Sequence, residues 1–329
     1  MALPFIEEMP KIELHCHLDG SLDLENAKEL LLERGEEYSL SQLKDLMQVD
    51  LSCPNLAEYL KRFVLPNHCL QDAAGLKASA YHLAKNAANE NVKYLEVRFA
   101  PTSSQDKGMK LLPIIEAVEE GLKQAREEFD IETGIILCMM RGLDDDRNLS
   151  VVKAGMELLG NGVVACDIAG DEASYPMSNH RELFRQIKKI GMPYTIHVGE
   201  TGNAANIREA LELGTKRLGH GIAMAKDEAL MQECGRLGVG VEICPTSNLQ
   251  TKAYNNISDC PIFLFKDHGI PVSLNTDNRT VSNTTLTNEF KIIDDCFGLE
   301  EELVRQIYKD SVEMSFASDE IKHTLLSKY

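Results

Sequence analysis

The chain has 329 residues, of which 43% are hydrophobic, so it can bury a large core. Its acidic residues outnumber its basic residues by 52 to 34, and the net charge of -18 disfavours binding to nucleic acid or to anionic membranes. A small molecule is the expected partner, and the oligomeric state stays open, with a monomer compatible with the sequence.

The cysteines and the apolar runs indicate the cell compartment. The nine cysteines are scattered and show no C-x-x-C spacing, which is typical of a reducing environment. No stretch approaches the roughly 18 consecutive apolar residues of a membrane span, and the first residues lack a basic start. We therefore expect a soluble, cytoplasmic protein.

Eight short apolar runs with β-branched residues predict eight strands. They are IELHCHL from 12, VKYLEVRFA from 92, TGIILCMM from 133, GVVACDIAG from 162, PYTIHVGE from 193, RLGHGI from 217, GVGVEICPTSN from 238 and PVSLNTDN from 271. Helical patterns lie between them: Pro113 is expected to open one helix, and another stops at Gly214. Eight strands that alternate with helices predict an α/β protein with a (β/α)8 TIM barrel.

About 80 residues separate the first two predicted strands, which is more than any later pair. Segments 55–69 and 72–90 look helical, so we predict one domain over 1–329 with a helical insertion at about 22–90. An insertion after the first strand emerges at the C-terminal face of the barrel and could cover a pocket there. Its stripe of Leu56, Tyr59, Leu60 and Phe63 fits a lid, although the same spacing also describes an ordinary core helix.

Polar residues follow several of the predicted strands, at the face where barrels carry their chemistry. His15 and His17 lie two apart in the first strand and point to one side. His197 ends the fifth strand, His220 the sixth, and Asp277 the eighth. Three imidazoles, from His15, His17 and His197, with the carboxylate of Asp277 suit one zinc ion, although nickel, cobalt and iron stay open.

Two residues near these ligands are candidates for proton transfer. Glu200 lies three residues beyond His197 and is the expected proton donor. His220 can hold or deprotonate a water molecule, and Asp277 can share that water from the other side. A solvated loop acid and a core histidine are the structural alternatives for Glu200 and His220.

The motifs HCHLDGSL, DIAGDE, HVGETG, RLGHGIAM, CPTSN and SLNTDN resemble the adenosine deaminase family in content and order. The resemblance implies the zinc-dependent hydrolysis of adenosine, and of 2'-deoxyadenosine, to inosine and ammonia in purine salvage. It implies one zinc on His15, His17, His197 and Asp277, with catalysis by Glu200, His220 and Asp277. It also implies substrate contacts from His17, Asp19, Gly170 and the apolar lid, to which Met140 adds a further wall.

Asn278 departs from the family pattern, in which a second aspartate commonly follows the metal ligand and faces purine N7. An asparagine amide can donate to N7 directly, so the change is compatible with a purine. Deaminases of adenine, AMP or an N6-substituted adenosine stay open, as does a purine-binding barrel without activity. Asp19 disfavours a 5'-phosphate, since a carboxylate there would repel the phosphoryl group.

Overall fold

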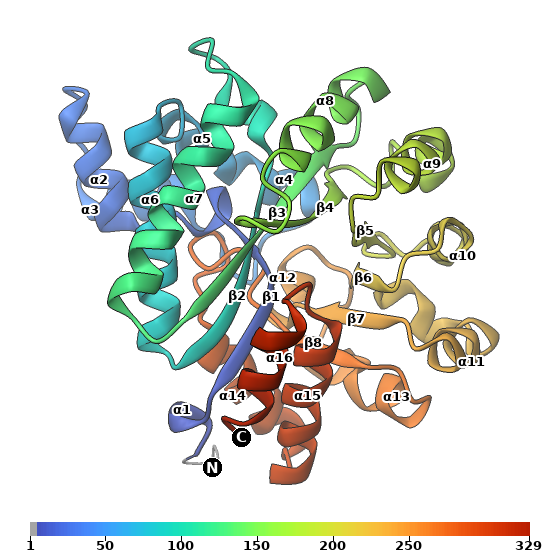
Figure 1. The fold of residues 1–329 in the computed structure, drawn as a ribbon. Helices are drawn as coiled ribbons and strands as arrows, with labels where there is room; N and C mark the ends of the chain where they lie inside the picture. The colour runs from blue at the N-terminus through green and yellow to red at the C-terminus, as the bar shows by residue number, and fades with distance from the viewer. Residues whose placement is uncertain (1–4) are drawn as a thin grey trace.

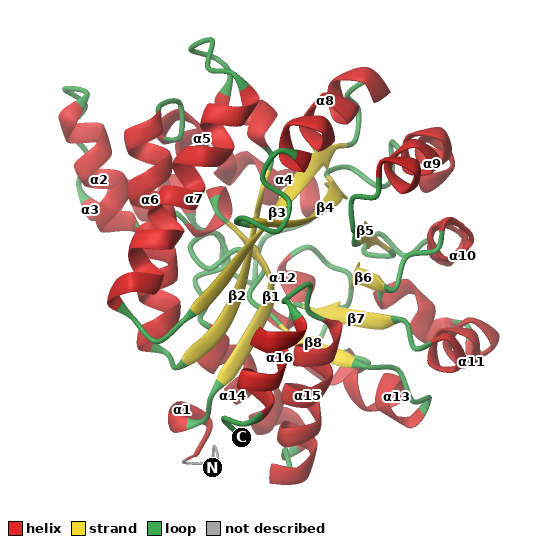
Figure 2. Ribbon diagram, in the orientation of Figure 1, coloured by secondary structure: helices red, strands yellow, loops and turns green. Residues whose placement is uncertain are grey.

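The computed structural model describes residues 5–329 and contains the eight predicted strands (Figures 1 and 2). The strands are β1 (Lys11–His17), β2 (Val92–Phe99), β3 (Glu132–Met140), β4 (Val163–Ala169), β5 (Ile196–Val198), β6 (Arg217–His220), β7 (Gly240–Ile243) and β8 (Val272–Leu274). They form two parallel sheets, β1–β4 and β5–β8. Parallel bridges Cys166–Tyr194 and Cys16–Asp277 join the sheets at both seams, so the barrel closes.

Helices surround the strands on the outside (Figure 2). Those after β2 are α7 (Leu111–Glu128), α8 (Asp145–Met156), α9 (Arg181–Ile190), α10 (Ala204–Leu213), α11 (Glu228–Leu237), α12 (Pro245–Gln250), α13 (Ile262–Asp267), α14 (Leu286–Phe297), α15 (Glu301–Met314) and α16 (Asp319–Leu326). The prediction that Pro113 opens its helix was wrong by two residues, because α7 begins at Leu111. Pro113 still lies in the first turn, where no intrahelical N–H bond is needed. Gly214 caps α10 with φ +93°, as predicted.

The segment before β2 is mainly helical. It contains α2 (Leu24–Glu33), α3 (Leu40–Met47), α4 (Leu56–Leu60), α5 (Val64–Cys69) and α6 (Ala73–Asn89), while α1 (Phe5–Glu8) precedes β1. The helical segments predicted at 55–69 and 72–90 are present, the first of them in three short pieces. The single-domain boundary and the movable lid stay predictions. Across 5–329, the helices are too short or too polar to cross a bilayer.

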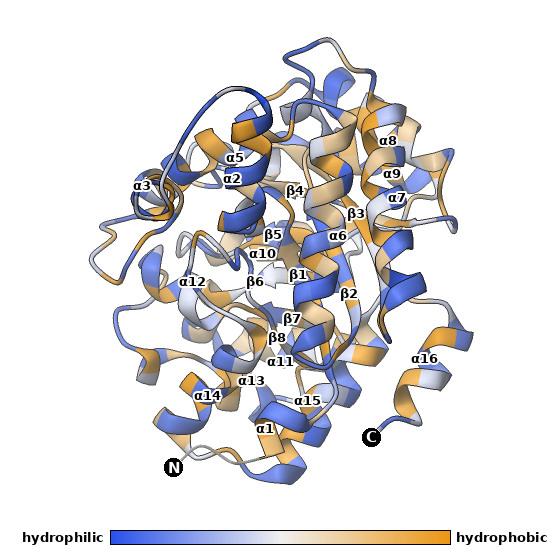
Figure 3. Cartoon of the chain, turned by 90° about the vertical axis from the view of Figure 1, so that its left-hand side faces the viewer, coloured by the Kyte–Doolittle hydropathy of each residue, from blue (hydrophilic) through white to orange (hydrophobic). Residues whose placement is uncertain are grey.

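The strands separate two kinds of buried residue. Alternate strand positions such as Leu95 and Val97 belong to the apolar core, whereas the intervening Glu96 and Arg98 are buried and ion-paired. Figure 3 shows the complementary pattern on the outer helices, which carry hydrophilic and hydrophobic residues in alternation along their length. The barrel therefore has a charged interior inside an apolar shell, and the histidines extend from that interior.

Candidate active site

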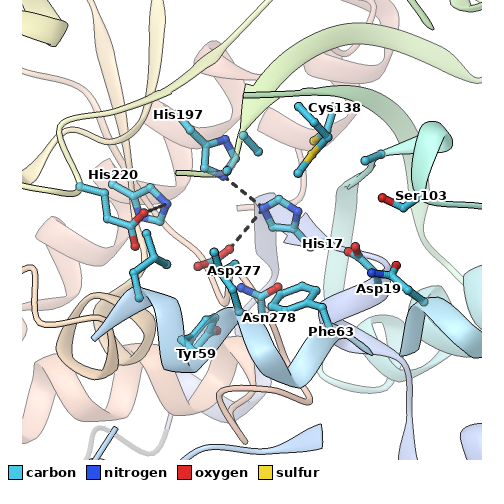
Figure 4. Close-up of a pocket in the computed structure, with 18 residues that line it drawn as sticks. His17, Asp19, Tyr59, Phe63, Ser103, Cys138, His197, His220, Asp277 and Asn278 are labelled. Atoms are coloured by element: carbon cyan, nitrogen blue, oxygen red, sulfur yellow. Dashed lines mark hydrogen bonds and ion pairs between the residues drawn. The ribbon is translucent and has the colours of Figure 1, made fainter. Parts of the chain in front are cut away.

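The four predicted metal ligands meet at one point. Figure 4 shows three of them, His17, His197 and Asp277. The Nε2 atoms of His17 and His197 are 3.1 Å apart, and Asp277 Oδ1 lies 3.3 Å from His15 Nε2 and 3.4 Å from His17 Nε2. Two ligands bound to one zinc ion at about 2.1 Å and a tetrahedral angle lie about 3.4 Å apart. The spacing of the four side chains therefore matches that of donors sharing one ion.

Buried carboxylates fix the orientation of two of these histidines. Glu242 contacts His15 Nδ1 at 2.7 Å, and Asp167 contacts His197 Nδ1 at 2.6 Å. These bonds place the proton on Nδ1, which leaves the Nε2 lone pair free for a metal. His15 Nε2 is buried without a hydrogen-bond partner among the described residues, which is costly unless a cation binds there. The residues present therefore fit a metal ion.

Burial and neighbouring charges keep the predicted ligands in the protonation states that bind a metal ion. Burial lowers the pKa of His17 well below its usual value, so its imidazole is neutral. Burial alone would raise the pKa of Asp277, but its close contact with His15 and the other neighbouring histidines hold that pKa well below the usual range. Ser247 Oγ also donates to Asp277 Oδ2 at 2.6 Å. Asp277 is therefore an ionised carboxylate.

Asp277 and His220 both adopt the left-handed backbone conformation, with φ of +61° and +64°. This conformation is rare for residues with a side chain and is found at sites where the surroundings enforce it. In both cases it occurs at or just after the end of a strand, where the chain turns across the mouth of the barrel. Asn91, Lys252 and Asn283 also have positive φ, but His220 and Asp277 are the two of these five residues that belong to the predicted site.

Glu200 and His220 lie beside the metal ligands, with Glu200 Oε2 3.9 Å from His220 Nε2. Asn248 contacts His220 Nδ1 at 3.0 Å through its Nδ2 atom, while its Oδ1 accepts from Cys244 N–H at 3.4 Å. With the amide in this orientation Asn248 donates to Nδ1, so the proton of a neutral His220 resides on Nε2. His220 then faces the cavity as a hydrogen-bond donor.

A cavity of about 280 Å³ adjoins this group. The predicted residues that line it are His17, Asp19, Leu56, Tyr59, Leu60, Phe63, Met140, Gly170, His197, Glu200, His220, Asp277 and Asn278. His15 is fully buried behind them. The structure therefore brings all the predicted site residues to one place, while the role of each stays a prediction.

The two ends of the cavity differ in character. His220 and His197 lie at one end, and Asp19 and Ser103 lie at the other (Figure 4). Burial raises the pKa of Asp19 to about 6. Tyr59 and Phe63 form one wall between the two ends, and the Tyr59 hydroxyl contacts Ser282 Oγ at 2.6 Å. The cavity can therefore hold an elongated ligand with an aromatic part and a polar end.

Sequence reasoning missed several residues of the site. Asn67, Ser103 and Cys138 line the cavity, and Glu242 and Asn248 orient two of its histidines. An acidic residue inside the apolar run GVGVEIC was a usable signal, because a buried carboxylate needs a partner. The hydrophilic residues of CPTSN gave no comparable indication of which histidine they contact.

The closed barrel and the ligand group at its C-terminal face define an amidohydrolase-like hydrolase. The family model described as adenosine deaminase matches residues 10–329. An adenosine deaminase of Clostridium perfringens is 42% identical over 321 residues, which cover 96% of this chain and 97% of the relative. The chain therefore belongs to the adenosine deaminase family.

Two solved structures have the same fold. An N6-mAMP deaminase from Arabidopsis superposes with a TM-score of 0.87 at 27% identity, covering 98% of each chain. An amidohydrolase of Burkholderia ambifaria, solved with bound Zn, superposes with a TM-score of 0.88 at 20% identity, covering 98% of this chain and 90% of the other. The prediction of a barrel hydrolase is confirmed.

Proposed function

We propose that this protein catalyses the zinc-dependent hydrolytic deamination of adenosine, and of 2'-deoxyadenosine, to inosine and ammonia. The observation that carries the proposal is the meeting of three imidazoles, Asp277 and Glu200 at one end of a nucleoside-sized cavity. Curated relatives with 42% identity over nearly the whole chain are named adenosine deaminases, which supports the same substrate here.

His15, His17, His197 and Asp277 would hold the zinc ion. The unpartnered His15 Nε2 and the ligand spacing of about 3.3 Å support this assignment. When bound, zinc would act as a Lewis acid and activate water near neutral pH. Zinc in the structural neighbour from Burkholderia agrees with this choice of metal.

The side chains around the cavity would act on the purine ring. Glu200 would donate a proton to N1 as water attacks C6, so that N1 accepts the electron pair displaced from the ring. Asp277 would accept the proton that the water loses and return it to the amino group. The C6–N bond would then break to release ammonia, while the C6 hydroxyl gives its proton back to Glu200. The Gly170 N–H would donate to N3, and the Asn278 amide would donate to N7. His220, with its proton on Nε2, would hold the attacking water by donating to its oxygen.

The far end of the cavity would hold the ribose. Asp19 would accept a hydrogen bond from the 5'-hydroxyl, and its carboxylate would repel a 5'-phosphate. Ser103 lines the same end of the cavity and would provide a second polar contact (Figure 4). This end therefore favours a nucleoside over a nucleotide or a free base.

A substrate panel tests the proposal. The zinc-loaded protein is assayed with adenosine, 2'-deoxyadenosine, adenine, AMP and N6-methyl-AMP. We expect kcat/KM for the two nucleosides to exceed that for every other compound by at least about 100-fold, from the loss of Asp19 contacts. Faster turnover of AMP, N6-methyl-AMP or adenine would overturn the substrate assignment, and no turnover of any compound would favour a purine-binding protein.

A further inference from the structure

Glu172 is a buried carboxylate that contacts the segment carrying Glu200. It lies in the loop after β4 and is 4% exposed. Its Oε1 accepts from Gly199 N–H at 2.7 Å and from Asn206 Nδ2 at 2.9 Å. Its Oε2 accepts from the N–H groups of Glu200 and Thr201 at 3.1 and 3.3 Å and from the Thr201 hydroxyl at 3.1 Å. One side chain thus binds three consecutive backbone amides.

The local backbone is shaped for this contact. Gly199 has φ +75°, and a Cβ at this position would lie 2.5 Å from Ile207 Cδ1. Only glycine fits such a turn without strain. The turn aims the amides of residues 199–201 at the same carboxylate, and each of the five donors is neutral, so they complement a single negative charge.

By contrast, the Glu200 side chain has few contacts of its own. Its ion-pair distance to His220 is 3.9 Å, longer than a hydrogen bond. Its direction into the cavity is therefore set mainly by its backbone, and that backbone is held by Glu172.

The same loop also carries Gly170, two residues before Glu172. Gly170 has φ +103° and lines the cavity. In the proposed function, its N–H meets purine N3 while Glu200 meets N1, and these two atoms flank one carbon of the same ring. Glu172 therefore joins the two loops that would contact this edge of the purine.

We propose that Glu172 is a positioning residue that fixes Glu200 relative to Gly170, and so sets the geometry for proton transfer to the ring. This inference rests on the proposed function, because the ring atoms come from it. Proton transfer develops in the transition state, so misplacing Glu200 lowers kcat more than it weakens substrate binding.

The test is Glu172→Gln. Glutamine keeps the shape of the side chain, but it turns an NH2 group toward the N–H and O–H donors that the carboxylate accepted from. A displacement of about 1 Å can cost about 100-fold in rate, so we expect kcat for adenosine to fall by about 10- to 100-fold. Binding of 1-deazaadenosine, which lacks N1, should change by less than about threefold. A kcat within about threefold of wild type would overturn the proposal, as would an equal loss in 1-deazaadenosine binding.

Two further variants keep the test decisive. Thr201→Val removes one of the five donors and serves as the test if Glu172→Gln fails to fold. It should lower kcat by a few-fold and leave 1-deazaadenosine binding unchanged. An unchanged kcat in Thr201→Val would count against the proposal. Asp310→Asn is the control for the loss of a buried carboxylate, since Asp310 is 5% exposed and accepts from Val272 N–H at 3.1 Å and from Lys266 Nζ at 2.5 Å. This variant should be less stable than the wild type but should keep the wild-type kcat. Absence of turnover in the wild type would reject the proposed function instead.

Discussion

Replacing Glu242 by glutamine tests how the barrel interior supports the metal ligands. Glu242 is fully buried and contacts His15 Nδ1 at 2.7 Å, Arg98 Nη2 at 3.0 Å and Arg217 Nε at 2.5 Å. Burial opposes its ionisation, but Arg98 and Arg217 outweigh that effect and hold the pKa of Glu242 below its usual range. All three partners therefore face an anion.

Glutamine keeps one acceptor oxygen and loses the charge. Hydrogen bonds to charged groups contribute about 1.5–3 kcal/mol each, and removing one partner of a buried ion pair costs about 3–5 kcal/mol. We therefore expect Glu242→Gln to lower the free energy of unfolding by about 3–5 kcal/mol in urea. Because His15 loses its orienting partner, zinc affinity measured by chelator competition should fall by about 10- to 100-fold.

Glu96→Gln is the matched control for this experiment. Glu96 is equally buried and pairs with Arg217 at 2.5 Å, but its hydrogen-bond partners do not include the predicted metal ligands. It should lose comparable stability and keep wild-type zinc affinity. The reasoning would be refuted if Glu242→Gln bound zinc as tightly as the wild type. It would also be refuted if Glu96→Gln lost as much zinc affinity as Glu242→Gln.

Three other changes give distinct outcomes. Asn248→Asp turns the donor to His220 Nδ1 into an acceptor, so nitrogen NMR should show that the His220 proton moves from Nε2 to Nδ1, and kcat should fall about tenfold. Protonation of the same His220 nitrogen in the wild type and the variant would contradict the assigned amide orientation. Tyr59→Phe removes the 2.6 Å contact with Ser282, and hydrogen exchange in α4 should become faster, whereas unchanged protection would show that this contact does not hold the helix. Burial raises the pKa of Glu289 from 4.5 to about 7, so the folded state retains its proton longer than the unfolded state does. Its contribution to stability should be complete below pH 4.5 and fall by about 3 kcal/mol as pH rises to 7. Glu289→Gln should remove that slope from urea titrations, and an unchanged slope would argue against the raised pKa.

The main features of the site followed from the sequence for a simple physical reason. Parallel strands of a barrel end on one face, so His17, His197 and Asp277 had to lie near one another once the strands were identified. The period-two pattern of β1 also placed His15 and His17 on the same side. Strand order and residue chemistry were sufficient for this step.

The residues that orient the ligands could not be assigned in the same way. Glu242 and Arg98 are 144 positions apart and pair only because their strands curve into one interior. Glu172 depends on the turn at Gly199, whose positive φ is a property of the folded loop. The start of α7 was misplaced because proline is tolerated throughout the first turn. Such features depend on three-dimensional contacts that spacing alone does not reveal.

Titrating the metal-depleted protein with zinc while following inosine formation from adenosine tests the central claim most directly. We predict that turnover is absent without metal, rises linearly to one zinc per chain, stays constant beyond that ratio, and is lost again on chelation. A folded protein with one bound zinc that forms no inosine, or a metal-free protein that forms it at the same rate, would contradict the account.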